Sequence, residues 1–156
     1  MFMLATQIES ITTTRRLTMS KLTPEIIEVL EGGNLAHLVT LNPDGSPQTT
    51  VVWVGVEGEE IVAAHLAVHK KVKNIRRDSR VSLSMETGGF DHRGFANYLV
   101  VYGTARVTEG GALDLMRRLN GIYFPGREFP PMPDVPGLIT RISIDRVAGV
   151  GPWAAG

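Results

Sequence analysis

Six short runs of apolar and β-branched residues recur along this chain, and residues that favour tight turns separate the early ones. The runs cover residues 35–41, 48–56, 61–68, 81–85, 98–107 and 138–144. Asn42-Pro43-Asp44-Gly45 lies between the first two and is typical of a turn that joins antiparallel strands. Because helices do not alternate regularly with these runs, the pattern favours an antiparallel sheet over a doubly wound α/β fold.

Three further segments have the composition of helices that could cover such a sheet. The first begins at Thr23-Pro24-Glu25, where threonine can cap the helix and proline suits its first turn, and Gly32-Gly33 ends it. The second covers about residues 70–77 and the third about 112–122, and a proline-rich stretch, 125–136, follows that cannot be regular structure. We therefore predict a mainly β fold with α, an antiparallel six-stranded barrel with flanking helices.

The length and composition bound the domain organisation. A chain of 156 residues with 43% hydrophobic residues supports one modest core. We expect an N-terminal arm over residues 1–20, a single domain over 21–150 and a C-terminal tail over 151–156. Trp153 in that tail is expected to dock on the barrel or on a partner subunit, because a solvated tryptophan would be unfavourable.

Several classes of function are disfavoured by what the chain contains. The absence of cysteine excludes disulfides, thiolate catalysis and cysteine-bound metal, and it fits a cytoplasmic location. No apolar run reaches the roughly 20 residues needed to span a membrane. The balance of 16 basic and 16 acidic residues argues against a dedicated nucleic-acid binder. His37 and His92 have no metal-binding spacing, and no Gly-x-Ser-x-Gly motif marks a nucleophilic serine.

The segment from His69 to Arg80 concentrates positive charge, with six of the 16 basic residues and a single acid. Lys70 and Lys71 stand at the N-terminus of the expected helix, where the helix dipole is positive and backbone N–H groups lack acceptors. A bound phosphate or carboxylate would relieve both problems, so we predict an anion site here, the alternative being a solvated basic face. One helix face is apolar and is expected to pack on the barrel: Val68, Val72 and Ile75.

The order of these segments and the motif Lys71-x-x-Asn74-x-Arg76-Arg77-Asp78 resemble the split β-barrel superfamily of pyridoxamine-phosphate oxidases and related deazaflavin-dependent reductases. Tyr102-Gly103-Thr104-Ala105 matches another family feature, and the resemblance covers about residues 22–150. It implies an FMN-binding-barrel-like fold and a homodimer with a cofactor groove at each end of the interface. The residues of the basic motif are more similar to those of the branch that uses the deazaflavin coenzyme F420. The substrate-binding motif found at the C-terminus of pyridoxamine-phosphate oxidases is absent.

In flavin-binding relatives a Ser-Arg-Lys triplet at the helix start holds the cofactor phosphate, and His69, Lys70 and Lys71 fill those positions here. Thr50 is the best candidate for a hydroxyl that contacts the ring, while Trp53 could equally belong to the core. His65 is a weak candidate for a catalytic proton donor, its alternative being a hydrogen-bonded structural residue. The full set of cofactor-binding residues that the resemblance implies is Thr49, Thr50, Trp53, His65, Ala67, His69, Lys70, Lys71, Asn74 and Arg76.

The implied function is an oxidoreductase that transfers a hydride from reduced F420 to a conjugated small-molecule acceptor, with no catalytic side chain strictly required. An FMN-dependent flavin reductase or oxidase of the same fold is the first alternative. A protein that binds a flavin or haem without turnover is the second. The glycine- and aromatic-containing loop over residues 88–95 either covers the ring or is an ordinary surface loop.

Overall fold

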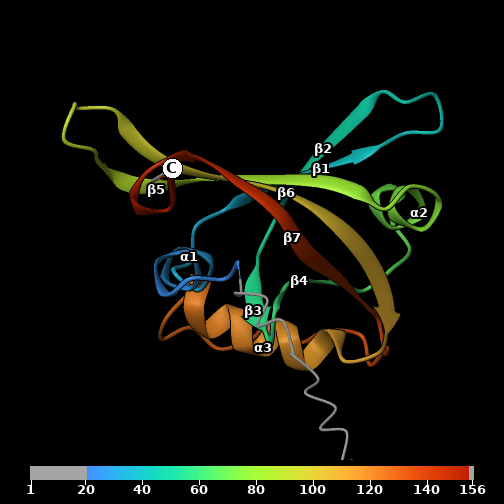
Figure 1. The fold of residues 1–156 in the computed structure, drawn as a ribbon. Coiled ribbons are helices and arrows are strands. Elements are labelled where there is room, and N and C mark those ends of the chain that lie inside the picture. The colour runs from blue at the N-terminus through green and yellow to red at the C-terminus, as the bar shows by residue number, and fades with distance from the viewer. Residues whose placement is uncertain (1–20, 155–156) are drawn as a thin grey trace, which may run out of the picture.

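The computed structural model describes residues 21–154, which fold into seven antiparallel strands and three α-helices (Figure 1). The strands are β1 (Ala36–Leu41), β2 (Pro47–Val52), β3 (Gly55–Glu57), β4 (Glu60–His65), β5 (Arg80–Phe90), β6 (Ala96–Glu109) and β7 (Leu138–Val150). The helices are α1 (Pro24–Leu30), α2 (Lys70–Arg77) and α3 (Ala112–Tyr123), and a 3₁₀ turn, η1, covers Pro152–Ala154. The expected arm over residues 1–20 lies outside the described residues.

All seven strands belong to one sheet, in the order β2-β1-β5-β6-β7-β4-β3. The two strands at its ends, β2 and β3, follow each other in the sequence but do not pair. The sheet therefore curls around its core without closing, and this open arrangement confirms the predicted split β-barrel fold.

The predicted strand over residues 48–56 is broken at Trp53, which corrects the expected six strands to seven. Tyr123 of α3 explains the break, because its hydroxyl accepts a hydrogen bond from the Val54 amide (2.9 Å) and donates one to the Asn34 carbonyl (2.8 Å). Backbone groups that would otherwise pair with a neighbouring strand are thus bonded to a side chain. Immediately after the break, a Cβ on Gly55 would lie 2.9 Å from Leu119 of α3, so the chain passes α3 at a distance that favours glycine.

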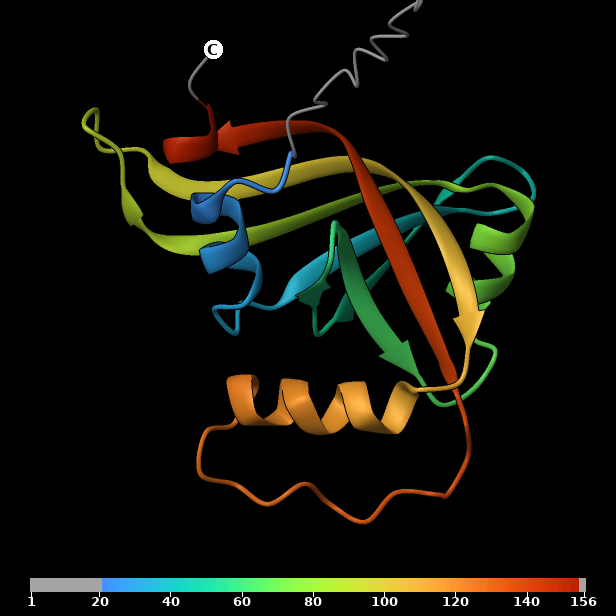
Figure 2. The same cartoon turned by 60° about the horizontal axis from the view of Figure 1, so that its bottom comes forward.

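The core fills the inside of the curled sheet. Its most buried large side chains come from β1, β4, β5, β6 and β7, and include Leu38, Ile61, Leu83, Leu99 and Ile142. Helix α1 adds Ile26 and Leu30 to this core, and its predicted cap is confirmed, since Thr23 accepts a hydrogen bond from the Ile26 amide (3.4 Å). Helix α3 and the proline-rich segment lie together at the bottom of the molecule in Figure 2, below β4.

Several predicted strand ends differ from the structure, and the run expected over residues 61–68 ends as β4 at His65. Strand β5 continues to Phe90 and β6 begins at Ala96, so the expected loop over 88–95 is the end of a long hairpin whose turn is held by Asp91. Strand β7 continues past residue 144 to Val150 because it pairs with β6 as far as Tyr98. Trp153 then donates a hydrogen bond to the Tyr98 carbonyl (3.1 Å) and packs on the core, which confirms that it docks on the barrel. Within residues 21–154, no helix is long and apolar enough to cross a membrane.

Candidate functional site

Helix α2 is fixed against the barrel by a buried polar network as well as by apolar packing. Val72 and Ile75 are buried, as predicted, but Val68 precedes the helix and is 46% exposed, so its expected packing on the barrel is wrong. Asn74 is buried and its amide nitrogen donates to Thr40 (3.0 Å), Asn42 (3.1 Å) and Gln48 (3.3 Å). These contacts tie α2 to the β1–β2 hairpin and leave no free donor on Asn74 for a ligand.

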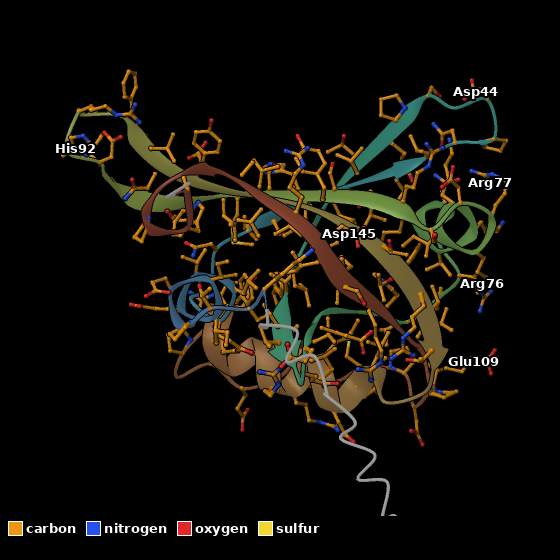
Figure 3. All side chains as sticks on the ribbon, viewed as in Figure 1. Asp44, Arg76, Arg77, His92, Glu109 and Asp145 are labelled. Atoms are coloured by element: carbon orange, nitrogen blue, oxygen red, sulfur yellow. The ribbon has the colours of Figure 1, made fainter. Side chains whose placement is uncertain are left out.

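The N-terminus of α2 presents unused donors. Lys70 and Lys71 are its first two residues, and no residue in the range 21–154 accepts a hydrogen bond from their amide groups. The preceding residue, His69, makes no side-chain capping bond. Arg76 and Arg77 lie in the last turn of α2, where positive charge suits the helix dipole. Figure 3 labels both residues beside this helix. Arg77 donates to the Leu41 carbonyl, whereas Arg76 is exposed.

Beside this helix is a cavity of about 480 Å³, within the size range of small-molecule sites. It lies at the break between β2 and β3, and α3 and the proline-rich segment form its other wall. Most of its lining is apolar or aromatic: Val51, Val52, Trp53, Ala64, Met116, Leu119, Phe124, Phe129, Pro130 and Met132. Trp53 is held in place by stacking on Tyr123, with 5.1 Å between ring centroids, and by an edge contact with Phe124.

Lys71 is the cation from α2 that reaches this cavity. Its side chain is half-buried, and burial lowers the pKa of its ammonium group. None of the ion pairs among the described residues includes Lys71. A partly desolvated ammonium group without a carboxylate partner is suited to bind an anionic ligand.

Thr50, on strand β2, carries a second polar group without a partner. Its hydroxyl oxygen is buried and forms no hydrogen bond with a described residue. Thr50 shares one face of β2 with Gln48, which bonds to Asn74, and Lys71 lies one helical turn before Asn74. Thr50 is therefore two strand residues, and Lys71 one helical turn, from the contact between Gln48 and Asn74. Thr49 points to the opposite, exposed face of β2, because successive residues of a strand alternate.

His65 is placed differently from the cavity residues. It is 3% exposed and its Nε2 lies 2.8 Å from the hydroxyl of Thr140 on the neighbouring strand β7. Burial, with smaller contributions from Lys71 and His69, lowers the pKa of His65 to about 4. The side chain is thus a neutral, hydrogen-bonded partner of Thr140 at neutral pH. Ala67 follows β4 and is exposed, and its carbonyl accepts a bond from the amide of His69 (3.0 Å).

The structure brings two of the residues predicted from the sequence to the cavity, Trp53 and Lys71, and places His69 and Lys70 at the start of the helix that carries Lys71. The cavity lining does not include six of the other predicted residues: Thr49, Thr50, His65, Ala67, Asn74 and Arg76. The proline-rich wall was not predicted, although aromatic and apolar residues spaced between prolines are its sequence signal: Phe124, Phe129, Pro130 and Met132. The unpaired ammonium group of Lys71 and the two free amides at the helix start fit the phosphate of a flavin-type cofactor, and the apolar lining fits its ring.

Comparisons with known proteins identify the family to which this chain belongs. No curated protein matches the sequence. A solved structure described as an F420 reductase is 28% identical, with a TM-score of 0.63, over 81% of this chain and 98% of that one. A conserved hypothetical protein from Mycobacterium tuberculosis is 24% identical (TM-score 0.62), over 80% of this chain and 81% of its own. An FAD-binding protein from Mesorhizobium loti is 19% identical (TM-score 0.59), over 82% and 94%. Residues 22–149 match the pyridoxamine 5'-phosphate oxidase family, and the chain belongs to it.

Proposed function

We propose that this protein is an oxidoreductase that binds coenzyme F420 and transfers a hydride from the reduced deazaflavin to a conjugated small-molecule acceptor. The observation that carries the proposal is that Lys71 reaches an apolar cavity beside the free amides at the start of α2, with the unpartnered Thr50 hydroxyl on the adjoining strand β2. Each of these groups lacks a partner within the described chain. A phosphate with apolar ring atoms next to it would satisfy the whole set.

The preference for F420 over FMN is supported by similarity to the F420 reductase, at 28% identity. FMN remains the second candidate, because the phosphate clamp would serve either cofactor. F420 and FMN would require the same contacts from the protein. The helix start and Lys71 bind the phosphate, Thr50 donates a hydrogen bond, and Trp53 and its aromatic neighbours exclude water from the ring.

The cofactor itself supplies the hydride chemistry when it is bound. The role of this chain is to position the cofactor ring and the acceptor next to each other and to exclude water from the reacting atoms. His65 is not assigned a proton-transfer role in this proposal, because its Nε2 is engaged with Thr140 and its side chain is buried outside the cavity lining.

The test is a fluorescence titration of the purified protein with F420 and, separately, with FMN. We expect F420 to bind at micromolar concentrations or below and FMN to bind more weakly. A charge-assisted hydrogen bond contributes about 1.5–3 kcal/mol, so Lys71→Ala should weaken F420 binding about 10- to 100-fold. Lys73→Ala is the matched control, since it removes the same charge from the same helix at an exposed position outside the cavity.

Three other results would contradict parts of the proposal. Tighter binding of FMN would move the protein to the flavin-dependent members of the family. Equal losses in Lys71→Ala and Lys73→Ala would mean that α2 acts only as a diffuse positive surface. Tight F420 binding without reduction of any conjugated acceptor would favour a carrier or storage protein over an enzyme.

A further inference from the structure

Helix α3 places one polar side chain in the middle of an apolar cavity wall. Met116, Asn120 and Phe124 all line the cavity, and their spacing of four residues puts them in one row along the helix and its C-terminal cap. Asn120 is only 6% exposed, whereas the other buried residues of α3 are apolar. Asparagine is also less favourable than leucine or methionine inside a helix. Stability alone would therefore favour an apolar residue at position 120.

One part of the Asn120 amide holds the proline-rich segment in place. Its Nδ2 donates a hydrogen bond to the Arg127 carbonyl (3.0 Å), and the Arg127 amide donates to the Phe124 carbonyl (3.1 Å). The Oδ1 atom of Asn120, in contrast, accepts no hydrogen bond from a described residue. An acceptor on a buried side chain is unfavourable without a partner. Because Asn120 lines the cavity, a ligand with an N–H or O–H group could supply that partner.

Two charged residues of the proline-rich segment lie next to Asn120. Arg127 and Glu128 both line the cavity, and neither forms an ion pair with a described residue. The Arg127 guanidinium carbon lies 5.4 Å from the centre of the Phe124 ring, an arrangement that holds the charge against the wall. Since the two charges are opposite, this wall favours a neutral polar ligand over an anion. A carbonyl oxygen on that ligand would accept a hydrogen bond from Arg127.

These polar groups are separate from the proposed phosphate site. Lys71 belongs to α2, whereas Asn120 and Arg127 belong to the other wall, made of α3 and the proline-rich segment. Figure 2 shows α3 below the sheet and α2, in green, at one edge of the molecule. Hydride transfer requires the acceptor to lie against the cofactor ring, with the reacting atoms about 3–3.5 Å apart. With a cofactor bound through Lys71, the acceptor would lie against the α3 wall.

We propose that Asn120 and Arg127 bind the hydride acceptor, and that this acceptor is a neutral, flat, conjugated cyclic amide. Its carbonyl oxygen faces Arg127 and its N–H group faces Asn120. The assignment rests on the proposed function and adds the class of substrate to it.

The reaction that follows is reduction of the C=C bond conjugated with the amide carbonyl. A hydride passes from the reduced deazaflavin to the β-carbon, and one proton passes through solvent from the deazaflavin to the α-carbon. The C=C bond becomes a single bond, and the deazaflavin is oxidised by two electrons. Negative charge develops on the carbonyl oxygen during hydride addition, and the Arg127 guanidinium stabilises it there.

The contacts can be tested by calorimetric titration of the cofactor-free protein with two ligands. Carbostyril is a flat, conjugated cyclic amide with an N–H group beside its carbonyl oxygen, and N-methylcarbostyril lacks that donor. In the unaltered protein, methylation should weaken binding about fivefold to tenfold, because Asn120 loses its hydrogen bond. In Asn120→Ala the two ligands should bind about equally. Equal binding of both ligands by the unaltered protein would overturn the proposal.

A purely structural role of Asn120 predicts a different pattern. If Asn120 only held the proline-rich segment, Asn120→Ala would weaken binding of both ligands by the same factor and leave the preference unchanged. Asn120→Asp keeps an acceptor oxygen but cannot donate to the Arg127 carbonyl, so it should retain the preference for carbostyril. Persistence of the preference in Asn120→Ala, or its loss in Asn120→Asp, would overturn the assignment of Asn120.

Arg127 is tested with the same two ligands, since both keep the carbonyl oxygen. Arg127→Gln should weaken the binding of both about threefold to tenfold. Arg117→Gln is the matched control, because the Arg117 guanidinium also lies over an aromatic ring of this wall, 5.6 Å from the centre of Phe129, but Arg117 does not line the cavity. Equal losses in the two variants would overturn the assignment of Arg127.

Adding F420 distinguishes the acceptor from the cofactor ring, which also has a cyclic amide edge. We expect carbostyril to bind the F420-loaded protein at least as tightly as the cofactor-free protein. Displacement of one by the other would mean that Asn120 contacts the cofactor ring, and it would overturn the proposal. Failure to bind F420 or FMN would instead refute the proposed function, while the titrations of the cofactor-free protein would still decide which groups Asn120 and Arg127 bind.

Discussion

The buried histidine makes a quantitative prediction about stability and pH. His65 is neutral in the folded protein because burial, with Lys71 and His69 nearby, lowers its pKa from 6.5 to about 4. In the unfolded chain it regains the ordinary value. Between these two values the unfolded state binds more protons than the folded state, so stability decreases as the pH falls from about 6.5 to about 4. The stabilisation is present above this window and is lost below it.

The size of the effect follows from the two pKa values. At pH 7.5 the histidine is neutral in both states and contributes almost nothing to the pH dependence. At pH 5.0 it is protonated in nearly all unfolded molecules and in few folded ones, so the protein should be about 2 kcal/mol less stable than at pH 7.5. The full loss, reached below the folded pKa, is about 3 kcal/mol. Asp78, whose pKa is lowered to about 2 by its hydrogen bonds with Arg80, acts only at more acidic pH.

Urea unfolding at pH 7.5, 6.0 and 5.0 measures this change in the free energy of unfolding directly. The dependence of that free energy on urea concentration should be the same at each pH. His65→Gln removes the titrating group, and we expect its stability to be nearly independent of pH over this range. His37→Gln is the control, because His37 is exposed on β1 and should leave the pH dependence intact. If His65→Gln loses as much stability at pH 5.0 as the unaltered protein, the account of His65 as a buried neutral base is wrong.

Three further substitutions test the fold and the site. Tyr123→Phe removes two hydrogen bonds at the strand break and should lower stability by about 2 kcal/mol, or the melting temperature by about 4–8 °C; calorimetry with Tyr98→Phe as the exposed control checks this. Gly149→Ala places a Cβ 2.1 Å from the Tyr98 carbonyl oxygen at a φ of +116°, so it should lower the free energy of unfolding by more than about 2 kcal/mol and shift the fluorescence of Trp153. Gly121→Ala is the control, because a Cβ there meets no atom within 4 Å and should change neither quantity. Thr50→Val removes the unpaired hydroxyl and should stabilise the protein by about 1 kcal/mol while weakening F420 binding; stabilisation with unchanged affinity would remove Thr50 from the site.

Much of the fold was predictable because its signals are local. The cap at Thr23 depends on its own helix, and the turn at Asp44-Gly45 depends on residues that favour a tight reversal. The basic helix α2 was predicted with the bounds that the structure has, since its apolar face and flanking residues are contiguous in the sequence. The similarity of its motif to known split-barrel proteins added the fold family, which the match over residues 22–149 bears out.

The candidate site was predictable only in part, and particular residues show why. Lys71 and Asn74 share one motif and one helix, yet Lys71 lines the cavity while Asn74 is buried in a network with Thr40 and Gln48. The spacing of three residues places both on the same side of α2. Only the position of the β1–β2 hairpin decides which of them is covered.

The sequence by itself determined the class of fold, the helix boundaries, most strands and the concentration of charge on α2, because periodicity, capping and turn chemistry act over a few neighbouring residues. Tertiary structure decided where the barrel opens, since the break after Trp53 depends on a hydroxyl 69 residues from Val54 in the chain. It also decided that the proline-rich segment forms the wall of a cavity and that His65 is buried against Thr140. These outcomes depend on contacts between distant segments, and such contacts exist only once the sheet has curled around its core.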